Sequence, residues 1–174
     1  MELIIWFFAG LCFLGLLLSI FFLLPFLVGA PYEPSRGKDL DKMVEFSKPE
    51  DGDKIAELGS GDGGVCIRLA ESVNSGNIEI HGYELNPFLV WISRLRVRRK
   101  GLRGRAFIHW KNFFKVDLGG FNKVVLFQFK TVMRKISRKF NKELKTGSRI
   151  VSHEWRLPGW KIKKKWRKIY LYET

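Results

Sequence analysis

The feature that most constrains this chain is a glycine-rich run at residues 57–63, which reads Glu-Leu-Gly-Ser-Gly-Asp-Gly. It closes a predicted strand, Lys54–Leu58, and opens a predicted helix from Gly64. About twenty residues later, at the usual spacing, Glu84 ends the next predicted strand. Glycines let a backbone turn tightly and approach a ligand, and a carboxylate at the second strand end can bind the two ribose hydroxyls of a nucleoside. The pattern therefore predicts a nucleoside cofactor in an α/β fold.

The charges in this run distinguish between cofactors. A dinucleotide fingerprint reads G-x-G-x-x-G and places a helix N-terminus against a pyrophosphate. Here one acid, Glu57, precedes the first glycine and another, Asp62, lies inside the loop, where both would repel a pyrophosphate. Carboxylates suit a cofactor that carries positive charge, such as the amino and sulfonium groups of S-adenosylmethionine. An ordinary glycine-rich turn is the alternative, but the flanking strand and helix and Glu84 argue against it.

The first thirty residues differ in composition from the rest. From Leu3 to Val28 there is no charged residue, and 19 residues are Leu, Ile, Phe or Val. The segment exceeds the ~20 residues that a helix needs to cross a bilayer. A cleaved signal peptide is the alternative, but Glu2 is acidic and the apolar run is longer than such peptides carry. We expect a transmembrane anchor over residues 1–30 and one compact domain over residues 31–174.

Two basic residues, Arg36 and Lys38, follow the apolar segment. By the positive-inside rule they place the rest of the chain on the cytoplasmic side of the membrane, which agrees with a cofactor made inside cells. The chain has no Arg- and Ser-rich transit segment, which favours a prokaryotic cell membrane over the mitochondrial inner membrane.

Charge is divided unevenly between the two halves of the chain. Residues 1–90 hold 6 Lys or Arg and 13 Asp or Glu, a net of −7, whereas residues 91–174 hold 25 and 4, a net of +21. A basic half predicts an anionic partner: a membrane surface, a nucleic acid or an acidic protein. For an anchored chain the membrane surface requires no further assumption, and a well-solvated basic face that binds nothing is the alternative.

The cysteines and histidines give no sign of a metal site or a disulfide. Cys12 lies in the apolar segment and Cys66 on the apolar side of the helix after the loop, which indicates a reducing compartment. Cys66, His81 and His109 do not have the spacing of a ligand set. We therefore expect no metal.

Strands alternate with helices along the rest of the chain, which predicts a mostly parallel, doubly wound sheet. The expected fold class is α/β: a Rossmann-like seven-stranded sheet with a C-terminal antiparallel hairpin, preceded by one transmembrane helix. In the helix that begins at Asn86-Pro87, the spacing of the apolar residues predicts one apolar side. That side holds Phe88, Trp91, Ile92 and Leu95. The predicted strands are 54–58, 78–84, 105–110, 123–127 and 148–153 with a hairpin over 161–173, and the predicted helices begin at 39, 64, 87 and 131.

These residues resemble a known family, the seven-stranded S-adenosylmethionine-dependent methyltransferases. Within it the chain is similar to the protein lysine methyltransferases that include membrane-anchored mitochondrial enzymes and a broad-specificity archaeal enzyme. The resemblance covers residues 31 to about 160, essentially the whole domain. It rests on Pro31-Tyr32-x-Pro34-Ser35, the loop 57–63, Gly82-Tyr83-Glu84-Leu85-Asn86-Pro87, Asn112-Phe113-Phe114, Ser152-His153-Glu154 and Gly159-Trp160.

The resemblance implies a role for each matching position. The loop would wrap the methionine part of the cofactor, Glu84 would hold the ribose, and Tyr32 would close over the cofactor near the sulfonium. Asn112 follows the third strand, where such folds contact the adenine, although many relatives carry Asp there, and Phe113 would pack on the adenine. The expected cofactor-binding residues are Tyr32, Glu57, Gly59, Ser60, Gly61, Gly63, Glu84, Asn112 and Phe113.

The expected catalytic residues are Tyr32, His153 and Glu154. A lysine amine must lose its proton before it can accept a methyl group, and His153 would take that proton through water while Glu154 would dock the incoming ammonium. The alternative is that both only cap the strand end by hydrogen bonds. We expect Trp155 and Trp160 to pack at the edge of the core.

Three functions are compatible with these residues. The first, which we favour, is a membrane-anchored protein lysine methyltransferase whose partners are a protein with an accessible lysine and the membrane, bound through residues 3–28 and the basic C-terminal half. The second is a methyltransferase for RNA, a lipid or another small molecule; the basic half suits RNA, but no base-reading motif is present. The third is a cofactor-binding membrane adaptor without activity. We expect a monomer and no nucleic acid.

Overall fold

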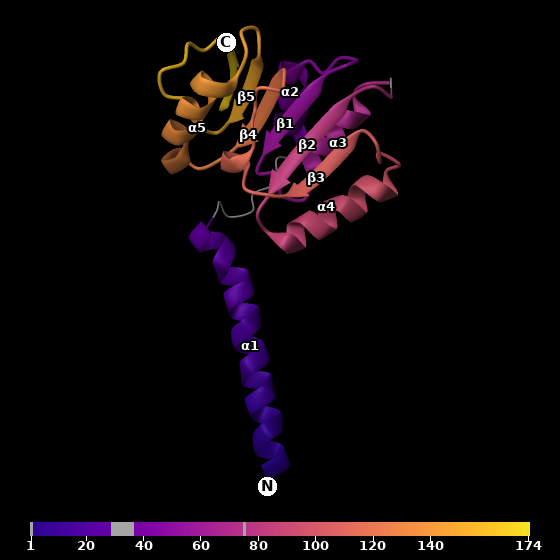
Figure 1. Cartoon of the computed structure of the whole chain (residues 1–174), viewed down its shortest axis with the longest axis vertical. Coiled ribbons are helices and arrows are strands. Elements are labelled where there is room, and N and C mark those ends of the chain that lie inside the picture. The colour runs from indigo at the N-terminus through magenta and orange to yellow at the C-terminus, as the bar shows by residue number, and fades with distance from the viewer. Residues whose placement is uncertain (1, 29–36, 75) are drawn as a thin grey trace. The chain divides into compact units, whose positions relative to one another are not determined.

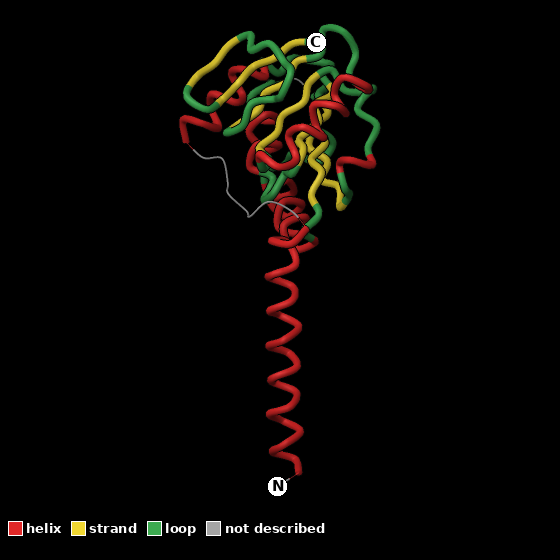
Figure 2. The backbone as a smooth tube through the Cα atoms, turned by 90° about the vertical axis from the view of Figure 1, so that its left-hand side faces the viewer, coloured by secondary structure: helices red, strands yellow, loops and turns green. Residues whose placement is uncertain are grey.

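The structure is a computed structural model that describes residues 2–28, 37–74 and 76–174. The chain divides into two compact units, Met1–Tyr32 and Glu33–Thr174. All the strands lie in the second unit, whereas the first contains one helix, as the colouring of Figure 2 shows. The second unit carries the site.

The first unit contains helix α1, Glu2–Val28. Its described apolar side chains are exposed, with Trp6 75% and Phe7 66% accessible. Within the described residues, no helix has both the length and the apolar character that crossing a membrane requires. The transmembrane anchor expected from the sequence therefore stays a prediction.

The second unit is built on one seven-stranded sheet in the order β3-β2-β1-β4-β5-β7-β6. The first five strands run parallel, and β7 pairs antiparallel with both β5 and β6. This confirms the predicted parallel sheet and its C-terminal hairpin. The strands are β1 Lys54–Leu58, β2 Glu79–Glu84, β3 Ala106–Trp110, β4 Lys123–Phe127, β5 Arg149–His153, β6 Lys164–Trp166 and β7 Ile169–Glu173.

Helices cover both faces of this sheet, so it is doubly wound (Figure 1). Each strand turns alternate side chains to opposite faces. Ile55 of β1 joins the core beneath α2, α3 and α4, whereas Ala56 and Leu58 join the core beneath α5. The helices of this unit are α2 Gly37–Ser47, α3 Gly64–Glu71, α4 Pro87–Arg99, a 3-10 turn η1 Phe113–Lys115, and α5 Lys130–Glu143.

Helix α4 begins where the sequence predicts but turns a different side to the core. Phe88 and Trp91 are 45% and 62% exposed, whereas the buried residues are Val90, Ser93 and Val97. The predicted apolar side was therefore wrong in these two residues. The Ser93 side of α4 approaches the start of α3, because a Cβ atom added at Gly63 would lie 2.8 Å from the Cβ of Ser93. Two small residues let the helices approach closely, and this brings the Ser93 side inward.

The topology places the ends of five strands along one edge. Because β1 to β5 are parallel, their carboxyl ends meet at the same edge of the sheet. The strand order reverses between β1 and β4, and ligands of open α/β sheets bind in the crevice outside such a reversal point. The loops that follow the five parallel strands, β1 to β5, therefore define the candidate site.

Candidate functional site

The glycine-rich loop is held to the end of β2 by backbone hydrogen bonds. The N–H groups of Gly59 and Ser60 donate to the carbonyl of Tyr83 over 2.9 and 3.0 Å. Gly59, Gly61 and Gly63 all have positive φ, at 80°, 53° and 77°. Side chains rarely adopt such angles, so glycine is required for the loop to fold back over the sheet edge.

Glu57 is the most unusual charge at this edge. It is 5% exposed at the end of β1, and its Oε2 accepts a 2.9 Å hydrogen bond from the backbone N–H of Cys66. Burial, with a smaller contribution from the charges of Asp62 and Glu84, raises the pKa of the Glu57 carboxyl to about 8, although hydrogen bonds from Cys66 lower it. Among the described residues it has no ion-pair partner, so a cationic ligand group would stabilise its charged form.

Ser60 lies in the most crowded part of the loop. A Cβ atom added at Gly82 would lie 2.8 Å from Ser60 Oγ and 2.7 Å from Cys66 Sγ. Ser60 Oγ is buried and has no hydrogen-bond partner in the described part of the protein. A buried hydroxyl without a partner is costly, so this atom is available to a bound ligand.

Glu84 closes the loop from the neighbouring strand. Its Oε2 accepts from Gly61 N at 2.9 Å, and its Oε1 accepts from the N–H groups of Leu85 and Asn86, both at 2.8 Å. These three bonds fix the carboxylate in position. Since a carboxylate offers about four lone-pair sites, one remains on Oε2 for a ligand hydroxyl.

Asp62 does not act as a free charge in this structure. Its carboxylate forms an ion pair with Arg96 of α4, and Arg96 also donates to the Asp62 carbonyl at 2.8 Å. The sequence argument that Asp62 repels a pyrophosphate is therefore weakened, because the arginine offsets its charge. The two carboxyl groups left to meet a cationic ligand are those of Glu84 and of Glu57, whose raised pKa means that such a ligand would ionise it.

Gln128 is a residue at this edge that the sequence analysis did not assign. Its Nε2 donates to the carbonyl of Leu58 at 2.8 Å and so joins the end of β4 to the end of β1. A Cβ atom at Gly59 would lie 2.0 Å from that nitrogen. The position of Gln128 directly after β4, beside the reversal point, was the signal that could have revealed it.

Asn112 and Phe113 follow β3 at the same edge. Asn112 caps η1, and its side-chain oxygen accepts from Phe114 N at 2.9 Å. Phe113 is 8% exposed and packs on Phe114 with ring centroids 4.4 Å apart. The structure thus holds both residues in place, with Phe113 mostly within the core.

His153 and Glu154 end β5. His153 is 9% exposed and packs against Phe127, with ring centroids 4.4 Å apart. Glu154 has a positive φ of 71°, its N–H donates to the Lys168 carbonyl at 2.7 Å, and its carboxylate pairs with the Lys168 ammonium. Glu154 therefore already binds one ammonium group at this edge.

Of the remaining predicted residues, Tyr32 lies outside the described residues. Trp155 and Trp160 are partly buried against the core beneath α5, which confirms the packing role expected for them.

Cys66 is fully buried, and burial raises the pKa of its thiol well above the usual range. In the described part of the chain, no three His, Cys, Asp or Glu side chains gather as a metal site would require.

Comparison with known proteins supports the class that this fold and site define. A model of the ANTKMT methyltransferase domain matches residues 57–164. A protein-lysine N-methyltransferase of Saccharolobus islandicus is 35% identical over 133 residues, which cover 76% of this chain and 81% of that protein. The adenine nucleotide translocase lysine N-methyltransferase of mouse is 31% identical over 136 residues, which cover 78% of this chain and 58% of that protein.

A solved structure shows the same fold. An RNA methyltransferase from Salinibacter ruber, in complex with S-adenosyl-L-homocysteine, superposes with a TM-score of 0.73 at 24% identity, over 80% of this chain and 91% of that one. Together with the family model and the archaeal relative, this fold and site define an S-adenosyl-L-methionine-dependent methyltransferase. The chain belongs to the ANTKMT methyltransferase domain family.

The residues at the sheet edge fit this cofactor. The cofactor carries an amino group and a sulfonium, and Glu57 offers a buried carboxylate without a counter-ion. It also carries ribose hydroxyls, and Glu84 keeps one lone pair free. Ser60 Oγ supplies an unpaired hydroxyl between them in the chain.

Proposed function

We propose that this protein transfers a methyl group from S-adenosyl-L-methionine to the amine of lysine side chains in proteins. The relatives above, named for lysine methylation in archaea and in mouse, support lysine as the acceptor. The observation that carries the cofactor part is the buried Glu57 without a cationic partner at the reversal point of the sheet.

We assign cofactor binding to the loop and the strand ends around it. Glu57 and Ser60 would bind the methionine part, Glu84 the ribose, and Asn112 and Phe113 the adenine. Gly59, Gly61 and Gly63 would let the backbone approach, and Tyr32 would close the site. When bound, the cofactor supplies a methyl group activated on a sulfonium, so the protein mainly has to position the acceptor.

The acceptor lysine must lose its proton before it can accept a methyl group. With a reference pKa near 10.4, removing its proton costs about 4–5 kcal/mol at pH 7. Glu154 would dock the incoming ammonium, a role that its ion pair with Lys168 makes chemically reasonable. His153, at the same strand end, would pass the released proton to water.

The acceptor class can be tested with methyl-labelled S-adenosyl-L-methionine, the full-length protein in detergent, and a membrane extract. Mass spectrometry should find labelled methyl-lysine in a discrete set of proteins, and this label should survive nuclease treatment. Label that nuclease removes would assign RNA as the acceptor instead, and label extracted with organic solvent would assign a lipid.

We further propose that residues 1–30 anchor the protein in a membrane and that residues 31–174 form the methyltransferase domain on its cytoplasmic side, in a prokaryotic cell membrane. Support comes from the uncharged stretch Leu3–Val28 and from Arg36 and Lys38 after it. The substrates would then include membrane-associated proteins.

Fractionation of cells tests the anchor. The full-length protein should stay with the membranes after a wash with carbonate, which removes peripheral proteins. The matched control carries three charges within the segment, Leu11→Lys, Leu14→Lys and Leu17→Lys, which should release the protein because each costs about 3 kcal/mol at a bilayer centre. Release of the unaltered protein by the wash would contradict the anchor.

A further inference from the structure

Four large apolar side chains gather at one corner of the second unit, Glu33–Thr174. Leu85, Phe88, Trp91 and Trp110 are 36%, 45%, 62% and 65% exposed. Among the described residues of this unit, only Phe129 is a further large apolar side chain with comparable exposure. Exposed apolar residues that gather in one place indicate an interaction surface, whereas single ones do not. We call these four residues the aromatic corner.

The aromatic corner is held together by contacts between its members. Trp110 Nε1 donates to the Leu85 carbonyl at 2.9 Å, so the indole at the end of β3 is fixed against the loop after β2. The rings of Phe88 and Trp91 stack with centroids 6.1 Å apart and planes 24° apart. The exposed rings are therefore positioned before any partner binds, which lowers the entropy lost on binding.

The aromatic corner adjoins the candidate site. Leu85 directly follows Glu84, and Glu84 is paired in register with Trp110. Figure 1 shows α4 beginning beside the tips of β2 and β3, where the carboxyl edge of the sheet lies. A partner seated on this corner would stand next to the edge at which the methyl acceptor must arrive.

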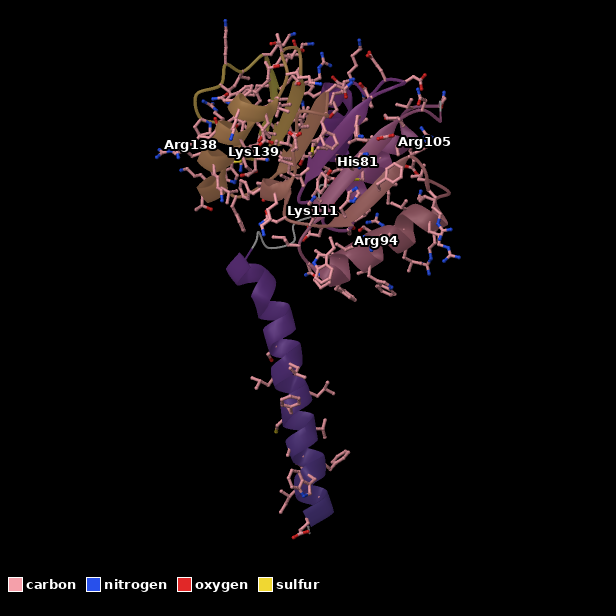
Figure 3. The ribbon with its side chains drawn as sticks, in the orientation of Figure 1. His81, Arg94, Arg105, Lys111, Arg138 and Lys139 are labelled. Carbon is pink, nitrogen blue, oxygen red and sulfur yellow. The ribbon has the colours of Figure 1, made fainter. Side chains whose placement is uncertain are left out.

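Cations extend this surface. On α4, Arg94 lies three residues after Trp91, and Arg98 lies four residues after Arg94. Lys111 directly follows Trp110, and Figure 3 labels Arg94 and Lys111. All three are exposed. The Nε of Arg94 donates to the Ile108 carbonyl. None of the three has an acidic partner within the described residues. The surface thus combines exposed indoles with cations whose charge is not offset.

This combination matches the chemistry of a lipid surface. Trp side chains are enriched at membrane–water interfaces, where an apolar ring and a polar N–H are both satisfied. Anionic headgroups attract nearby Lys and Arg, each strengthening binding about fivefold. An anchor in the same chain, as proposed above, would hold the second unit at the membrane by a covalent link.

We propose that the aromatic corner, with Arg94, Arg98 and Lys111, is a membrane-docking surface that seats on anionic phospholipid headgroups. The inference rests on the proposed membrane anchor. Docking there brings the carboxyl edge of the sheet to the bilayer surface. The enzyme then selects lysines that lie near the headgroups of its own membrane, and lysines far from the membrane are poor acceptors.

The test uses the full chain in lipid nanodiscs, with one fluorescent label and nitroxide lipids that quench it. Pro87→Cys, in a Cys12→Ser background, places the label within the aromatic corner and leaves the four apolar side chains intact. Lys142→Cys on exposed α5 is the matched control. The nanodiscs contain phosphatidylcholine alone or with about one third phosphatidylglycerol, which supplies the anionic headgroups.

In the anionic nanodiscs, we expect the label at position 87 to be quenched at least about threefold more than the label at position 142. The label at position 87 should be quenched less in neutral nanodiscs than in anionic ones. Arg98→Gln and Lys111→Gln should each weaken the quenching, and Trp91→Ser with Trp110→Ser should abolish it. These four substitutions should leave cofactor affinity unchanged, which shows that the variants are folded.

Equal quenching at both positions, in a protein that elutes with the nanodiscs, would overturn the docking surface while the anchor stands. A protein that elutes apart from the nanodiscs would show instead that the anchor has failed, and the inference would fail with it. A label at position 87 that responds only when a lysine-bearing protein is added would overturn the lipid assignment in favour of a protein partner.

Discussion

The two ends of strand β1 carry buried acids in opposite situations. Asp53, just before the strand, is 6% exposed and contacts the ammonium of Lys123, the amide of Asn122 at 2.6 Å and the N–H of Glu50 at 2.6 Å. Glu57, at the other end, is 5% exposed and accepts one backbone hydrogen bond, from Cys66. At the amino edge of the sheet the buried acid is thus paired with a cation, whereas within the described residues the buried acid at the carboxyl edge is not. We call these the paired edge and the unpaired edge.

This difference separates a stabilising acid from one reserved for a ligand. A buried charge is tolerated only when it is paired and hydrogen-bonded, as Asp53 is. Glu57 meets the same burial without a cation, so its pKa rises to about 8. A ligand with positive charge would pair with Glu57 as Lys123 pairs with Asp53. The parallel topology explains why the unpaired edge is the one whose loops bind ligands.

The largest expected effect comes from removing the ion pair between Lys123 and Asp53 at the paired edge. Lys123→Met leaves Asp53 buried without its cation, so the free energy of unfolding should fall by about 3–5 kcal/mol. Urea unfolding measures this loss. Lys54→Met is the control, because Lys54 is exposed and its pair with Glu79 contributes at most ~1 kcal/mol. Equal stability losses in the two variants would remove the distinction between the edges.

A substitution at the unpaired edge should change the affinity for the cofactor rather than the free energy of unfolding. Glu57→Gln keeps the acceptor for the Cys66 N–H but removes the charge. Affinity for S-adenosyl-L-methionine should fall about 10- to 100-fold, because a hydrogen bond to a charged group contributes ~1.5–3 kcal/mol. Titration calorimetry measures the affinity, and Glu79→Gln, which changes an exposed acid on β2, should leave it unaltered. An unaltered affinity in Glu57→Gln would refute the role of this carboxylate.

Crowding around Ser60 offers a test that leaves charge unchanged. In Gly82→Ala the added methyl would meet Ser60 and Cys66, and overpacking of this kind costs about 1–3 kcal/mol. Since the loop must move to relieve the contact, cofactor affinity should fall along with the melting temperature. Gly120→Ala, where an added Cβ meets nothing within 4 Å, should change neither.

The smallest of the mutational effects concerns turnover. Glu154→Gln should lower kcat for lysine methylation at least about tenfold, or ~1.4 kcal/mol in the barrier, if the carboxylate docks the ammonium. Glu173→Gln is a matched control, since Glu173 is also half-buried and pairs with Lys163 and Arg149, but at the amino edge. A full rate in Glu154→Gln would leave this residue with only its ion pair to Lys168.

Local pattern predicted the sheet well because its strands are short apolar runs bounded by turn residues. Lys54–Leu58 and Lys123–Phe127 agree with β1 and β4 at both ends. The pattern failed for α4, which buries Ser93 close to Gly63, a residue thirty positions away. Ion pairs such as Asp62 with Arg96 were equally hidden, because spacing along a chain does not reveal which charges meet in the fold.

In the candidate site, the sequence identified the carboxylates but not their states. The loop pattern predicted that Glu57 and Glu84 lie at neighbouring strand ends, and β1 and β2 do pair in register there. It could not predict that Glu84 would accept three backbone N–H groups while Glu57 accepts one. Those differences arise from the loop's path, which depends on tertiary contacts.

The most direct test of the account is the number of protons exchanged when S-adenosyl-L-methionine binds at pH 7. Glu57, with a pKa of about 8, is largely protonated in the free protein, and pairing with a cation would ionise it. Calorimetry in two buffers of different ionisation enthalpy gives the proton count. We predict that the unaltered protein releases close to one proton more than Glu57→Gln, and that its affinity rises with pH up to about 8. Equal proton counts in the two proteins would contradict the claim that the Glu57 carboxyl ionises when it pairs with the bound cofactor.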